Sequence, residues 1–108
     1  MNQPVDLRFI GMLSSESAEA AALGGITALD EAHRQVRGWK VSMEPPQSAW
    51  GLPAYAVQVQ AELDEGALVA TRAHGSDLMA AMQDAFEGMQ QLLGRRASAQ
   101  PQHVTSSY

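Results

Sequence analysis

The chain has 108 residues, which is enough for one domain with a single core but too few for two. It lacks cysteine, so disulfides and thiolate metal sites are excluded. Its 7 basic and 12 acidic side chains give a net charge of −5, which disfavours membrane surfaces and nucleic acids, DNA included, as partners. The sequence shows no signal-peptide pattern and no apolar run near the roughly 20 residues that cross a bilayer, so we expect a cytoplasmic protein.

The N-terminal third predicts a strand followed by a helix. Apolar and polar residues alternate over residues 5–10, as is typical of a strand, and Gly11 ends the pattern. The serines at 14–15 can cap a helix that begins near Glu16. Two glycines at 24–25 interrupt this helix at a cost of roughly 1 kcal/mol each, which favours either a bend or close packing at that point. The apolar face of the helix is formed by Ala18, Ala22, Ile26 and Leu29.

The middle of the chain predicts three further strands. Residues 36–44 alternate, with Trp39 on the apolar side, and a proline pair at 45–46 stops the strand because proline cannot donate to a ladder. Residues 54–63 show the cleanest alternation, and residues 64–66 form a short hairpin turn into a last strand at 67–73. That last strand is apolar on both faces.

The C-terminal third predicts a second helix and a tail. His74 and Gly75 make a corner, Ser76 is the expected N-cap, and Gly94 is the expected end of the helix. Residues 97–108 are small and polar without periodicity, so we expect a disordered tail there. The stripe that faces the sheet consists of Leu78, Met82, Ala85, Met89 and Leu92.

The order is therefore β-α-β-β-β-α, an α+β fold in which both helices cover one face of a four-stranded sheet. The first two strands flank a helix and should run parallel, whereas the last three form an antiparallel meander. Residues 1–96 are expected to make up the single domain.

Enzyme chemistry has little support in the sequence. Its three histidines lie on three different elements, and no metal-binding His spacing, phosphate loop or nucleophile motif occurs. The carboxylate pairs at 30–31 and 64–65 are adjacent residues, which do not converge on one substrate atom. We therefore expect no catalytic residue, no metal and no cofactor.

The last strand and second helix resemble those of a known family, the bacterial ribosome hibernation factors, also called sigma-54 modulation proteins or ribosome-associated inhibitor A. The resemblance rests on residues 66–71, on 75–82 with Asp77, Ala81 and Met82 at the family's helix opening, and more loosely on the first half. It covers about residues 5–96 and implies the short form of the family and its βαβββα fold.

The resemblance implies a protein that binds the small ribosomal subunit near the decoding centre, blocks transfer and messenger RNA, and keeps ribosomes inactive under stress. Such binding needs basic helix surfaces that neutralise phosphates of 16S ribosomal RNA. Here the family's basic positions are held by Glu19, Gly25, Ala28, Gly88 and Gln91.

The candidate RNA-binding residues are six of the seven cations and one histidine. Arg95 is the best match to the family, which is basic just past this helix. The full set is Arg34, Arg37, Lys40, Arg72, His74, Arg95 and Arg96.

A second interpretation is a diverged member that no longer binds ribosomal RNA and acts through a protein partner or as a homodimer. It is motivated by apolar residues expected on the outer face of the sheet, which can mark an interface. They are Ala54, Ala56, Leu68 and Ala70.

Overall fold

A computed structural model describes residues 4–46 and 54–105 of the chain. The elements follow the predicted β-α-β-β-β-α order, and the α+β fold class is confirmed. They are β1 (Val5–Phe9), α1 (Glu16–Ala32), β2 (Val36–Glu44), β3 (Tyr55–Leu63), β4 (Leu68–Gly75) and α2 (Leu78–Thr105).

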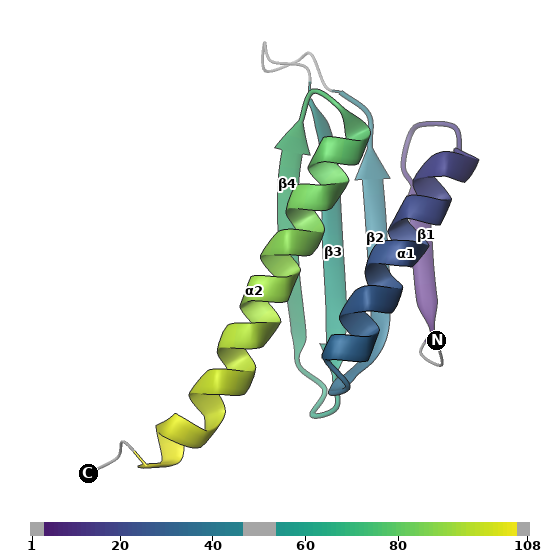
Figure 1. Ribbon diagram of the computed structural model, residues 1–108. Helices are drawn as coiled ribbons and strands as arrows, with labels where there is room; N and C mark the ends of the chain where they lie inside the picture. Colours follow the sequence, from purple (N-terminus) through teal and green to yellow (C-terminus); the bar gives the residue numbers. More distant parts are fainter. Residues whose placement is uncertain (1–3, 47–53, 106–108) are drawn as a thin grey trace.

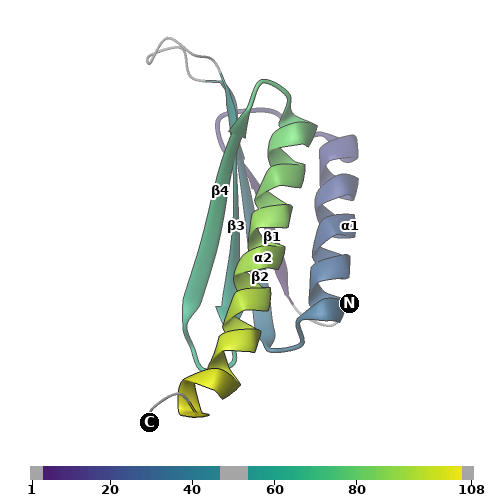
Figure 2. The same ribbon diagram turned by 60° about the vertical axis from the view of Figure 1, so that its left-hand side comes forward.

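The four strands form one sheet in the order β1-β2-β3-β4. β1 pairs parallel with β2, because α1 carries the chain back between them, and the other two pairs are antiparallel. Both helices lie on the same face of the sheet, with α1 over the β1–β2 side and α2 over the β3–β4 side (Figures 1 and 2). No helix of residues 4–46 or 54–105 lies on the other face of the sheet, so this part of the chain has a helical face and an open sheet face.

The core lies between the sheet and the helices. Strand alternation sends Trp39, Val41 and Met43 inward, where each is buried, and the neighbouring Lys40 and Ser42 point to the open face. The helices contribute stripes at spacings of three and four residues, as predicted. The buried helical residues are Ala18, Ala22, Ile26, Leu29, Ala81, Met82, Ala85, Met89 and Leu93.

Helix α1 begins at the predicted cap and stays continuous through its glycines. The Ser15 hydroxyl accepts a hydrogen bond from the amide of Ala18 at 3.3 Å. A Cβ on Gly25 would lie 2.8 Å from the ring of Phe86, whereas one on Gly24 would meet nothing within 4 Å. Close packing is therefore confirmed at Gly25, and the predicted alternative of a bend is not needed.

Helix α2 differs from its prediction at both ends. His74 and Gly75 still belong to β4, and α2 begins at Leu78, so Asp77 rather than Ser76 directly precedes the helix. The carbonyl of Asp77 accepts from the amide of Ala81 at 3.0 Å. The strand continues through the predicted corner because it keeps pairing with β3 as far as Gly75.

The predicted helix end at Gly94 is wrong, since α2 continues to Thr105. Gly94 does not adopt the positive φ with which glycine ends helices; among the described residues only Gly11 and Gly66 have one. The helical backbone of residues 97–105 also differs from the irregular tail expected there, because α2 passes through Gly94 without the backbone turn that would end it. The division into a domain at 1–96 and a tail at 97–108 stays a prediction.

Candidate functional site

Four candidate cations lie at one end of the molecule, which we call the basic end (Arg34, Arg37, Arg95 and Arg96). At this end α1 stops, β2 begins, and α2 runs past the β3–β4 turn (Figure 1). The amide of Asp64 in that turn donates to the carbonyl of Gln35 at 2.9 Å, which holds the turn beside the α1–β2 connection. The fold thus brings residues distant in sequence to a common edge.

The basic end is not uniformly positive. Arg96 donates to Glu65 at 2.9 Å. Two further carboxylates lie nearby in the fold, Asp64 in the β3–β4 turn and Glu31 in the last turn of α1. Exposed pairs of this kind contribute about 0–1 kcal/mol to stability, but they reduce the charge available to a phosphate. Arg34, Arg37 and Arg95 are exposed and form no ion pair among the residues that the structure describes.

The other three candidates, Lys40, Arg72 and His74, lie on the open sheet face. Arg72 is paired there, donating to Gln58 at 3.2 Å and lying 3.6 Å from a carboxylate oxygen of Glu44. Lys40 is in register with Asp6 of β1 on one side and with Gln60 of β3 on the other. The seven predicted residues therefore divide between two surfaces and do not form one patch.

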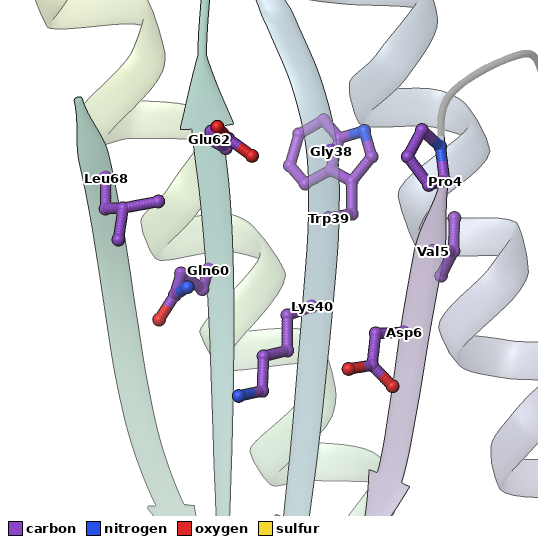
Figure 3. A pocket seen from close by; sticks show the side chains of 9 residues that line it. All are labelled: Pro4, Val5, Asp6, Gly38, Trp39, Lys40, Gln60, Glu62 and Leu68. Atoms are coloured by element: carbon purple, nitrogen blue, oxygen red, sulfur yellow. The ribbon is translucent and has the colours of Figure 1, made fainter. Parts of the chain in front are cut away.

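A shallow hollow of about 240 Å³ opens on the sheet face beside Lys40. Figure 3 shows the Lys40 side chain extending from β2 toward β3 and the Asp6 side chain extending from β1 toward β2, with Glu62 on β3 and Leu68 on β4. The hollow exists because Gly38, next to a register shift in β2, has no side chain to fill it. Its charges are mixed, so it does not favour an anion.

The apolar surface predicted on the sheet face is present only in part. Leu68 is 62% exposed and Ala70 is exposed, but Ala56 is buried and Ala54 is partly buried. Ala56 is covered because β3 is a central strand, whereas Leu68 and Ala70 lie on the edge strand β4. Two exposed residues within a polar face are ordinary and do not by themselves indicate an interface.

The helical face carries acidic rather than basic charge. Neither α1 nor α2 up to Gly94 contains Lys or Arg. The predicted replacements Glu19, Ala28 and Gln91 are all exposed there. The exposed acidic residues of these two helices are Glu16, Glu19, Glu31, Asp84 and Glu87.

A groove of about 360 Å³ separates the two helices on that face. Its walls come from small residues of α1 and from apolar residues of α2, where Met79 is 39% exposed. We call it the interhelical groove, and it is lined by Ala21, Gly25, Met79, Met82, Gln83 and Phe86.

Within the described ranges no cluster of His, Asp or Glu is arranged to hold a metal ion. His33 is buried at the end of α1, and its Nε2 has no hydrogen-bond partner. Asp30 is buried as well and accepts from the indole Nε1 of Trp39 at 3.2 Å, which satisfies both groups inside the core. No helix in the described part of the chain is long and apolar enough to span a membrane.

Comparison with known proteins gives matches in structure but not in sequence. No family model and no curated protein sequence matches the chain. A ribosomal subunit interface protein from Coxiella burnetii superposes with a TM-score of 0.76 at 8% identity, covering 89% of this chain and 99% of that one. The N-terminal domain of Thermus thermophilus Protein Y superposes with a TM-score of 0.69 at 19% identity, covering 88% and 98%.

The chain shares the fold of these two proteins. The fold implied by the resemblance is thereby confirmed, over nearly the full length of both neighbours. At such low identity the likeness concerns the backbone and does not transfer the function of individual side chains.

Sequence reasoning missed the interhelical groove and the Asp30–Trp39 hydrogen bond. Gly25, whose place inside a helix the sequence does not settle, was the only residue in the sequence that hinted at the groove. Phe86, on which Gly25 packs, lies one position outside the predicted sheet-facing stripe of the second helix. Sequence reasoning treats Asp30 only as half of an adjacent carboxylate pair, although its spacing from Ile26 places it on the buried side of α1.

Proposed function

We propose that the protein associates with the small ribosomal subunit and inhibits translation, as the resemblance to the ribosome hibernation factors implies. The proposal rests on one observation, which is that the superposition covers 99% of the chain of a ribosomal subunit interface protein. The basic end supports the proposal. Its residues Arg34, Arg37 and Arg95 come from elements that meet at this end, and their exposed side chains are available to phosphates of 16S ribosomal RNA.

The acidic helical face restricts how this binding takes place. Phosphates are repelled by α1 and by α2 up to Gly94, since neither contains a cation there. Contact with ribosomal RNA is therefore assigned to the basic end. With few cations engaged, we expect an affinity that depends only moderately on salt, because each neutralised phosphate adds about 0.7–0.9 to the slope of log affinity against log salt.

Co-sedimentation of the purified protein with small subunits tests the proposal. The protein should pellet with the subunits at low salt and dissociate as salt rises. The double variant Arg34→Glu with Arg95→Glu should lose association and flatten the salt slope by about 1–2, since two phosphate contacts are removed. Translation of a reporter mRNA in a purified system should fall when the wild-type protein is added.

Arg8→Glu is the matched control, because Arg8 is an exposed cation on β1 whose charge is already paired with Asp6 at 3.1 Å. This variant should sediment like the wild type. If the wild-type protein stays in the supernatant at low salt, or if Arg8→Glu weakens binding as much as the single variant Arg95→Glu, which makes the same charge change at the basic end, the proposal is wrong.

A further inference from the structure

The interhelical groove has no role in the fold or in the RNA contact proposed above. Its lining is apolar or small except for Gln83, with Met79 39% exposed and Phe86 partly buried, and its volume of about 360 Å³ accommodates several side chains of a ligand. Gly24 adds an open stretch of helix surface, because no atom lies within 4 Å of where its Cβ would be. A polypeptide can therefore approach the backbone of α1 closely.

The charge around the groove selects among possible occupants. Every exposed charged side chain of α1, and of α2 as far as Gly94, is a carboxylate. Glu87 directly follows the lining residue Phe86 in α2 and is exposed. RNA and anionic lipid are repelled by such a face, whereas lysine and arginine side chains are attracted to it.

A second copy of this chain is a poor occupant for the same reason. A two-fold pairing through the groove is isologous, so the acidic face of one copy would meet the acidic face of the other. Like charges placed opposite each other across an interface are unfavourable. The helical face thus favours a different protein.

We propose that the interhelical groove binds an amphipathic, lysine- and arginine-rich helix of a partner protein. Apolar residues spaced three and four apart on that helix enter the groove against Met79 and Phe86. Flexible methionine side chains adapt to such anchors. The basic flanks of the helix face the carboxylates of α1 and α2, of which Asp84 and Glu87 directly follow lining residues in the sequence.

The test uses the full chain and a labelled 18-residue helical peptide with leucine along one face and lysine on the other, followed by fluorescence anisotropy at low salt. Met79→Asp adds a negative charge but removes an apolar anchor. It should weaken binding by about fivefold or more, although charge attraction alone predicts tighter binding. Glu87→Lys should also weaken binding by about fivefold, through lost attraction.

Glu62→Lys is the matched control, since it makes the same charge change at an exposed position of the open sheet face. It should bind like the wild type, and a leucine–glutamate peptide of the same pattern should not bind. Amide NMR shifts should concentrate at Ala21, Gly25, Met79 and Phe86. Circular dichroism verifies that each variant remains folded.

Several outcomes overturn the inference. They are absence of peptide binding to the folded wild-type protein, equal weakening by Glu87→Lys and Glu62→Lys, and tighter binding by Met79→Asp. The proposed occupant is also wrong if a short RNA oligonucleotide shifts the same four amide signals, or if the protein self-associates through these residues. Because the assay contains no ribosome, it fails or succeeds independently of co-sedimentation through the basic end.

Discussion

At the scale of single residues, the two adjacent glycines of α1 show how neighbours in a sequence acquire different constraints. Gly25 faces α2, where the ring of Phe86 occupies the space that a side chain would need. Gly24 faces open space and lies on the exposed side of the helix. The helix therefore requires glycine at one position and only tolerates it at the other.

Alanine substitutions at these positions should have opposite effects on stability. Gly25→Ala places Cβ 2.8 Å from Phe86, so it should destabilise the fold by about 1–3 kcal/mol, as overpacking does. Gly24→Ala should stabilise the fold by about 0.5–1 kcal/mol through the higher helix propensity of alanine. Urea denaturation measures both; equal effects at the two positions would contradict the packing of α1 on α2.

At the scale of secondary-structure elements, helix α2 is where local signals and the structure disagree. Gly94 followed by two arginines is typical of a helix end, yet the helix passes through it without a positive φ. In a helix interior, glycine costs about 1 kcal/mol relative to alanine, and nothing within 4 Å of Gly94 requires its small size.

Gly94→Ala should therefore stabilise the protein by about 0.5–1 kcal/mol and increase its helical circular dichroism. Gly66→Ala is the comparison, because the φ of +93° at Gly66 in the β3–β4 turn is strained for alanine and should lower stability. A loss of stability on Gly94→Ala would mean that the helix ends there after all.

The elements that sequence reasoning predicted well are those with strong periodicity and clear stops. The alternation around Trp39 and the serine cap of α1 depend on neighbours in sequence, so they are visible without a structure. The contacts between α1 and α2 depend on residues about 60 positions apart, such as Gly25 and Phe86, and no local pattern encodes them. The same holds for the candidate site. The sequence identifies the cations, but only the fold shows that Arg72 lies on the open sheet face and Arg95 at the basic end.

At the scale of the whole molecule, charge is distributed unevenly over the surfaces. The helical face is acidic up to Gly94, the basic end gathers four arginines, and the open sheet face is mixed. The fold resembles that of a ribosomal subunit interface protein, but the charges of the helical face are opposite in sign to what RNA binding needs. If the protein binds ribosomal RNA as proposed above, we expect charge rather than shape to limit the affinity.

Making the helical face basic should raise that affinity. A triple variant with lysine at Glu19, Ala28 and Gln91, all exposed, should bind small subunits about tenfold more tightly and with a steeper salt dependence. The control places lysine at Glu62, Leu68 and Ala70, which gives the same change in net charge on the sheet face. Quantitative co-sedimentation at several salt concentrations compares the two; equal gains would show that only net charge matters.

Strand β4 borders the sheet with one side of its backbone unpaired by any other strand of the described chain. The unpaired backbone groups of such an edge strand can pair with an extended segment of another chain, and aggregation can start there. The first half of β4 is apolar, with Leu68 and Ala70 exposed. The second half carries the polar side chains of Arg72 and His74, which disfavour the addition of another strand. We therefore expect Arg72 and His74 to oppose aggregation at this edge strand, independently of any nucleic acid.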